Sequence, residues 1–84
     1  MGKPLHFTRH ALEAIRQRDL DLEWIDRAVH APDWEEVDPQ DPEVARRFLA
    51  VPERDNRYLR VACVETPAEV RILSAFFDRR ARPK

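Results

Sequence analysis

Two segments near the start of the chain have hydrophobic residues at helical spacing. The first, residues 9–18, follows Thr8, whose hydroxyl can accept a hydrogen bond from a first-turn amide. The second lies between Asp21, a favourable N-cap, and Pro32, which ends it. The residues expected to face the core are Ala11, Ala14, Ile15, Leu22, Ile25 and Val29. Because few residues separate the two helices, they are predicted to form a hairpin.

The hydrophobic period then changes from that of a helix to that of a strand. Residues 34–38 are a short strand candidate, and the following residues, 39–43, are predicted to be a loop rich in Pro and Asp. Three further strands are predicted at residues 46–51, 57–65 and 69–78. The turns between these strands are short, so neighbouring strands must be antiparallel and form a meander.

The last predicted strand is almost continuously apolar from Ile72 to Phe77, which is typical of a central strand covered on both faces. The expected fold class is α+β, with an N-terminal helical hairpin packed on a three- to four-stranded antiparallel sheet. A chain of 84 residues is enough for one domain. We expect an ordered core at residues 6–80 and a flexible tail at residues 81–84.

Several protein classes are excluded by simple features. No apolar run approaches the roughly 20 residues of a membrane span, and the first residues lack the apolar stretch of a signal peptide. Cys63 is the only cysteine, so no internal disulfide is expected. Its alternation with Val61 and Leu59 predicts a core side chain rather than a nucleophile. We therefore expect a cytoplasmic protein with no membrane partner.

The charge is small overall but unevenly distributed. The formal net charge is −1, yet residues 19–43 carry ten acidic residues against one arginine. Residues 44–84 carry ten cations against five acids. This asymmetry indicates a surface with an acidic and a basic face. A basic face is one feature of proteins that bind nucleic acid or acidic protein segments.

The segment "SAFFDRRARPK" at residues 74–84 joins an apolar strand to a cluster of cations, which suggests a phosphate-binding site. Imidazole suits proton transfer near neutral pH, and guanidinium suits bidentate contact with phosphate. Arg71 alternates with Leu73, Ala75 and Phe77, and Arg79 would continue that face. The groups predicted for an anion site are His10, Arg18 and Arg79 as catalytic residues and Arg47, Arg60, Arg71 and Arg80 as phosphate-binding residues.

A purely structural interpretation stands beside this one. Arg18 points close to the apolar side of its helix, so it can lie over the hydrophobic edge and pair with a carboxylate, for which Asp78 is a candidate. His10, near the start of that helix, can equally be a packing residue. No metal site is predicted, because Thr8 as a cap places His6 outside the helix and no third ligand stands out. Gly2 is the only glycine, so no phosphate loop and no cofactor are expected.

The segments "FTRHALEAIRQRDLDLEWI", "APDWEEVDP", "RYLRVACVE" and "ILSAFFDRR" resemble a small bacterial family catalogued as a domain of unknown function. The resemblance covers roughly residues 6–80. That family is similar in element order to the BrnT and RelE/ParE toxins of toxin–antitoxin pairs, which implies a RelE/BrnT-like fold. Many such toxins cleave RNA without a metal. The recurring polar positions of the family fall on His10, Arg18, Asp78, Arg79 and Arg80.

Three positions depart from the pattern of this family. Ala14 stands where many relatives have Arg, Asp19 where relatives often have Gly, and Phe76 where relatives often have Tyr. Asp19 is then a tolerated but less suitable residue for a left-handed conformation at the end of the helix. The loss of Arg and Tyr at the other two positions weakens the expectation of nuclease activity.

Three functions follow as hypotheses. The first is a toxin-like, metal-independent RNA endonuclease, or a protein that binds RNA or the ribosome, in which His10 acts as acid or base. The second is a non-catalytic interaction domain whose basic face binds an acidic segment, such as that of a cognate antitoxin, or nucleic acid. The third is weak homo-oligomerisation through an exposed strand.

Overall fold

The computed structural model describes residues 2–83, and both predicted helices are present in it. α1 spans Arg9–Gln17, and the Thr8 hydroxyl accepts a hydrogen bond from the N–H of Ala11 at 3.1 Å. α2 spans Leu22–His30, and the Asp21 carboxylate accepts from the N–H of Glu23 at 2.8 Å. Both caps are those predicted. Neither helix is long and apolar enough to cross a membrane. Lys84, the last residue of the predicted flexible tail, lies outside the described residues, as does Met1.

The buried side of α2 differs from the prediction at one residue. Leu22, expected in the core, is 53% exposed, whereas Trp24, Ile25 and Ala28 are buried. Trp24 packs edge-on against Phe77 with ring centroids 6.0 Å apart. Val29 lies seven residues after Leu22, on the same side of α2, and is buried, so the exposure of Leu22 comes from its place at the first residue of the helix rather than from its side.

The sheet has five strands in the order β1-β5-β4-β3-β2. Their bounds are Leu5–Phe7 for β1, Trp34–Asp38 for β2, Asp41–Val51 for β3, Arg57–Glu65 for β4 and Val70–Phe77 for β5. The four strands from β2 to β5 form the predicted antiparallel meander, with a short 3-10 helix, η1, at Pro52–Arg54 between β3 and β4. β1 pairs with β5 in parallel, so the sheet is mixed.

Two expectations about the strands are corrected. The sheet has five strands rather than three or four, because β1, which is only three residues long, adds an edge. Three residues are too few to show an alternating pattern, and the partner of Leu5 is the distant Val70. The loop predicted at residues 39–43 is too long, because only residues 39 and 40 form the turn and β3 already begins at Asp41. Residues at this end of the β2–β3 hairpin are exposed, so their polarity does not oppose a strand.

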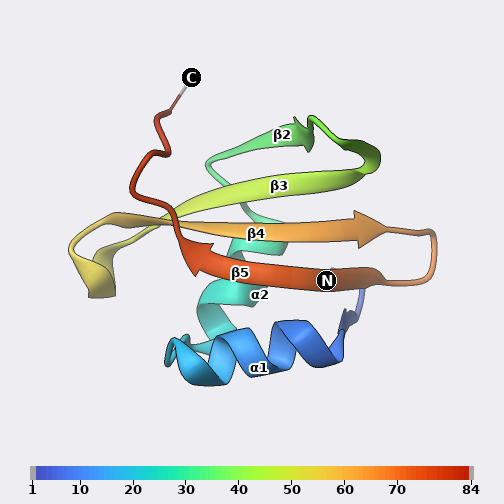
Figure 1. Ribbon diagram of the computed structural model, residues 1–84, viewed down its shortest axis with the longest axis horizontal. Helices are drawn as coiled ribbons and strands as arrows, with labels where there is room; N and C mark the ends of the chain where they lie inside the picture. The colour runs from blue at the N-terminus through green and yellow to red at the C-terminus, as the bar shows by residue number, and fades with distance from the viewer. Residues whose placement is uncertain (1, 84) are drawn as a thin grey trace.

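Both helices cover the same face of the sheet, here called the inner face (Figure 1). α1 packs on β5, and α2 packs on β3 and β4. The core between the layers includes Ile25, Val51, Leu59, Val61, Cys63 and Ile72. Cys63 is fully buried, as predicted. The opposite, outer face carries no helix, so the prediction that the last strand is covered on both faces is wrong (Figure 1).

A β-bulge in β5 changes which side chains share a face. Cys63 pairs with Ile72, but Ala62 pairs with Ser74, so Leu73 is an extra residue in β5. Ile72 and Ala75 are therefore both buried in the core, although they are three positions apart. The exposed Arg71 is on the other face, so the predicted row of Arg71, Ala75 and Phe77 on one face does not exist. Alternation alone could not reveal the inserted residue.

Candidate nucleic-acid interface

A hollow of about 440 Å³ lies at the C-terminal end of β5, where the start of β4 and the chain after β5 meet. Its cationic lining consists of three arginines, Arg57, Arg79 and Arg82. Tyr58 and Phe77 provide aromatic surface, and Asp78 is the one carboxylate among the described lining residues. Guanidinium and aromatic groups together suit a ligand that carries both phosphates and bases.

The chain after β5 is held at this hollow by backbone hydrogen bonds. The N–H of Asp78 donates to the carbonyl of Tyr58 at 2.9 Å, and the N–H of Ala81 donates to the carbonyl of Asp78 at 3.3 Å. Ala81 is 7% exposed. The segment leaves the sheet on the side away from the helices (Figure 1). The flexibility predicted for residues 81–84 stays a prediction, but the fold gives Ala81 a buried position.

Asp78 is already engaged and does not neutralise the three arginines of the lining. Its Oδ2 accepts a hydrogen bond from Arg60 Nη1 at 3.1 Å, and its Oδ1 accepts from the backbone N–H of Arg80 at 2.9 Å. Burial raises the pKa of the carboxyl, but the Arg80 N–H and the Arg60 guanidinium outweigh that effect and leave the pKa below its usual value. Asp78 is therefore ionised at neutral pH and paired with an arginine behind the hollow.

Arginines also surround the ring of Phe77 on the inner side of the sheet. The guanidinium carbon of Arg57 lies 4.6 Å from the ring centroid of Phe77, and that of Arg54 lies 5.8 Å from it. Arg54 also lies 5.2 Å from the ring of Trp24 and donates to the carbonyl of Asp19 at 3.2 Å. Such stacking leaves the edges of the guanidinium groups free to donate hydrogen bonds.

Aromatic surface continues from the hollow across the outer face. Four side chains lie in one row across neighbouring strands, in the order Trp34, Phe48, Arg60 and Phe76. Trp34 stacks on Phe48 with centroids 4.6 Å apart, and Trp34 also contacts Tyr58 edge-on at 5.2 Å. Arg60 lies over the Phe76 ring at 4.8 Å. Tyr58 thus connects the hollow to this row.

Among the predicted site residues, the structure brings together those near the end of β5. Arg79 lines the hollow, and Arg60 reaches it through Asp78. Arg80 is exposed on the same turn, which its backbone N–H helps to close. Asp78, considered as a partner for Arg18, binds Arg60 instead.

Arg47 and Arg71 lie away from this group. Arg47 donates to Glu35 and Glu65, both at 2.6 Å, and to the carbonyl of Val29 at 3.1 Å. Burial lowers the pKa of Arg47, but the hydrogen bonds to the two carboxylates outweigh this effect and leave the pKa above its usual value. This arginine ties α2 to the sheet. Arg71 is exposed near the other end of β5, 3.7 Å from Glu69.

His10 and Arg18 lie on the helical side of the molecule, whereas Arg60 points to the outer face. Arg60 alternates with the buried Leu59 and Val61, so the sheet separates it from α1. α1 ends at Gln17 and Arg18 is its C-cap, which leaves the Arg18 side chain exposed rather than directed inward. Within residues 2–83, neither His10 nor Arg18 has a polar side-chain partner.

Three polar lining residues were not predicted as site residues, namely Arg57, Tyr58 and Arg82. A signal for the first two existed, because the start of one strand in a meander lies beside the end of the next strand. Arg82 belongs to the segment predicted to be a flexible tail, and only the turn that begins at Asp78 places it at the hollow. In the part of the chain that the structure describes, no group of three or more His, Cys, Asp or Glu side chains is placed to hold a metal ion.

Fold and site together define a small α+β domain, with a helical hairpin on one face of a mixed sheet and an arginine–aromatic hollow at one end. Residues 7–77 match the family model described as "Domain of unknown function (DUF4258)", and the chain belongs to this family. The resemblance to a family of unknown function is thereby confirmed. No curated protein and no solved structure gives a significant match to the chain.

Proposed function

We propose that this protein binds single-stranded RNA through the hollow at the end of β5. The observation that carries the proposal is the convergence of Arg57, Arg79 and Arg82 around two aromatic side chains, with the only described lining carboxylate paired to Arg60. The resemblance in element order to BrnT and RelE/ParE toxins, which is an expectation from the sequence, favours RNA as the polymer because many such toxins cleave RNA, whereas ParE acts on DNA gyrase.

The chemistry of the hollow matches an unpaired nucleotide. Each guanidinium can form paired hydrogen bonds to phosphate oxygens, and Arg79 has no side-chain partner within residues 2–83 that competes for it. The ring of Tyr58 offers a stacking surface for a base, which is worth about 1–3 kcal/mol in single-strand complexes. Bases in a duplex are already stacked and paired, so single-stranded RNA is the favoured form.

The geometry favours binding over cleavage. Phosphodiester cleavage requires groups that accept and donate protons at the reacting atoms. No imidazole is among the described residues that line the hollow, and both oxygens of Asp78 accept hydrogen bonds. His10, the predicted acid or base, lies on α1 on the helical side of the molecule. We therefore assign RNA binding to the hollow and keep cleavage as an outcome of the test.

The test is a titration of labelled single-stranded RNA with the purified protein, followed by fluorescence anisotropy at several salt concentrations. Arg57→Gln and Arg79→Gln should each weaken binding about tenfold and reduce the salt slope by about 0.7 per lost phosphate contact. Tyr58→Ala should weaken it by a similar factor. Arg71→Gln, at the far end of β5, is the matched control and should change binding less than about twofold.

Parallel arms use a duplex RNA, a DNA strand of the same sequence, and ribosomes. The proposal is overturned if the wild-type protein binds no RNA in any of these forms, or if Arg57→Gln and Arg79→Gln bind as tightly as Arg71→Gln. RNA integrity on a gel separates binding from cleavage. If the protein cleaves RNA and the His10→Ala variant does not, the protein is an enzyme rather than a binding protein.

A further inference from the structure

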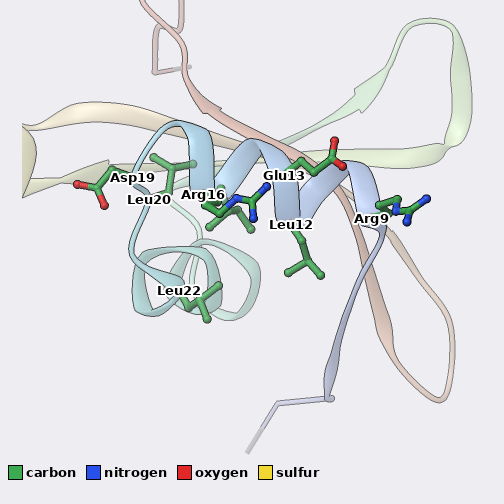
Figure 2. A pocket seen from close by; sticks show the side chains of 8 residues that line it. Arg9, Leu12, Glu13, Arg16, Asp19, Leu20 and Leu22 are labelled. Carbon is green, nitrogen blue, oxygen red and sulfur yellow. The ribbon is translucent and has the colours of Figure 1, made fainter.

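A second hollow, of about 540 Å³, lies between α1 and the start of α2 (Figure 2). Its floor includes the buried Ile15 and Leu20, and its walls include Leu12 and Leu22, which are 50% and 53% exposed. Figure 2 shows the side chains of Leu12 and Leu22 pointing in the same direction, away from the sheet. Of the large hydrophobic side chains that are exposed within residues 2–83, two of three lie here. Exposed leucines gathered at one place mark an interaction surface.

The charges around this hollow alternate in sign along α1. In chain order they are Arg9, Glu13, Arg16 and Asp19, the last lying just beyond the helix (Figure 2). Among the described residues, none of these four side chains has an ion-pair or hydrogen-bond partner. Unpaired charges at a protein surface are ordinary, but a strict alternation beside exposed leucines restricts what can dock there.

We propose that a second copy of this chain docks on this surface, with the two α1 helices antiparallel about a two-fold axis near residue 14. Reversing the order of the four charges places Arg9 opposite Asp19 of the other copy, and Glu13 opposite Arg16. Every position then meets the opposite charge, as an isologous interface requires. A parallel arrangement would place each charge opposite itself. The rim carries two charges of each sign, so it favours neither an acidic nor a basic partner.

The apolar part of the interface is small. A standard protein–protein interface buries about 800 Å² on each partner. The described residues expose 5681 Å², so such an interface would need about a seventh of the surface. Two leucines and one face of a nine-residue helix provide less than that. We therefore infer a dimer with a dissociation constant in the micromolar range, in exchange with the monomer.

The inference does not rest on RNA binding, because the hollow at the end of β5 contributes no residue to this surface. The test is sedimentation equilibrium from low micromolar to millimolar protein. Wild-type protein should show a concentration-dependent mass that reaches a dimer. Glu13→Arg and Arg16→Glu should each weaken dimerisation at least tenfold, because each places like charges opposite one another. Arg71→Glu, a charge reversal at an exposed position on the outer face of the sheet, is the control and should leave the dimer within about twofold.

The decisive variant carries both Glu13→Arg and Arg16→Glu. It restores opposite charges across a two-fold axis, so dimerisation should return to within about threefold of wild type. Leu12→Ser should weaken the dimer without changing the far-ultraviolet circular dichroism. The proposal is overturned by a monomer at the highest concentration, by a dimer that ignores both single reversals, or by a double variant that stays monomeric. A dimer insensitive to both reversals would lie elsewhere, such as at the β2 edge.

Discussion

Arg60 and Asp78 form an ion pair, with 3.1 Å between Nη1 and Oδ2, that joins the centre of the outer face to the turn after β5. The side chains are only 24% and 15% exposed, and Arg60 also lies over the ring of Phe76. The Nε of Arg60 is buried without a partner among the described residues. The pair therefore fixes Asp78 in the wall of the hollow that is proposed to bind RNA. Because Asp78 is paired with Arg60, it does not neutralise the arginines that line the hollow.

Replacing Asp78 by Asn should destabilise the protein by about 1–3 kcal/mol, because it leaves the Arg60 guanidinium partly buried without a counter-charge. Urea denaturation measures the change in the free energy of unfolding. Glu69→Gln is the control, since the Glu69 side chain makes only a long, partly exposed pair with Arg71, at 3.7 Å, and its loss should change stability by less than about 0.5 kcal/mol. Equal effects of the two variants would contradict a structural role for the Arg60–Asp78 pair.

Glu65 should make stability depend on acid pH. Hydrogen bonds from Lys3, at 2.7 Å, and from Arg47, at 2.6 Å, lower the pKa of Glu65 from 4.5 to about 2. A carboxyl whose pKa is lower in the folded state stabilises the protein fully above its unfolded pKa. That contribution is lost as the pH falls from about 4.5 to about 2. Because the Glu65 side chain is 39% exposed, solvent screening reduces the contribution to about 1 kcal/mol.

The measurement is the melting temperature of wild type and Glu65→Gln between neutral pH and pH 2. Wild type should be the more stable at neutral pH, and the two curves should converge as the pH approaches 2. Glu43→Gln, which alters an exposed carboxyl at the hairpin end, should follow wild type throughout. A Glu65→Gln difference that persists unchanged at pH 2 would show that charge is not its source.

Asp19 adopts a left-handed conformation, with φ of 53°, directly after the end of α1. Glycine meets no steric penalty there, whereas a residue with a Cβ does. Asp19→Gly should therefore stabilise the monomer by about 0.5 kcal/mol, and Asp19→Ala should destabilise it by about 1 kcal/mol. Thermal unfolding at low protein concentration keeps the proposed dimer out of the comparison. Identical melting temperatures for the two variants would contradict this account.

Leu73 is the inserted residue of the bulge in β5, and its deletion should be tolerated. Removing it lets Ile72 and Ser74 follow a regular alternation, so Ala75 and Phe77 stay on the inner face. We expect a folded protein that is destabilised by about 1–2 kcal/mol from the loss of a half-buried leucine. Deletion of Ala62 from β4, which has no extra residue, should instead turn Val61 and Leu59 outward and abolish folding. Circular dichroism and cooperative unfolding distinguish the two outcomes.

Most of the secondary structure could be predicted from local patterns. Thr8 and Asp21 cap the helices as predicted because capping is a contact within one turn of chain. The ranges 34–38 and 57–65 are strands as predicted, because alternation and turn residues are also local. Membership in a family of unknown function was equally accessible, since several short motifs keep their order along the chain.

The site was only partly accessible. Arg79 was predicted in a phosphate-binding role, and its place in the hollow agrees with that expectation without testing it. Arg57 and Tyr58 precede Arg79 by about 20 residues, and only the pairing of β4 with β5 brings them together. Arg47 was predicted for the same anion site as Arg79. In the structure, two carboxylates from separate strands, Glu35 and Glu65, already form ion pairs with Arg47. Which arginines are free is decided by partners distant in sequence.

The sequence by itself determined the two helices, their caps and the antiparallel meander. Its many arginines also meant that most of them would lie at the surface rather than in the core. The tertiary structure alone decided that β1 adds a parallel edge, that Leu73 shifts the faces of β5, and that the outer face carries no helix. It also placed Arg60 against Asp78 rather than leaving Asp78 to Arg18. The physical reason is one of range. Propensity, capping and alternation act over a few residues, whereas parallel pairing, strand register and ion-pair choice depend on surfaces that meet only when the chain has folded.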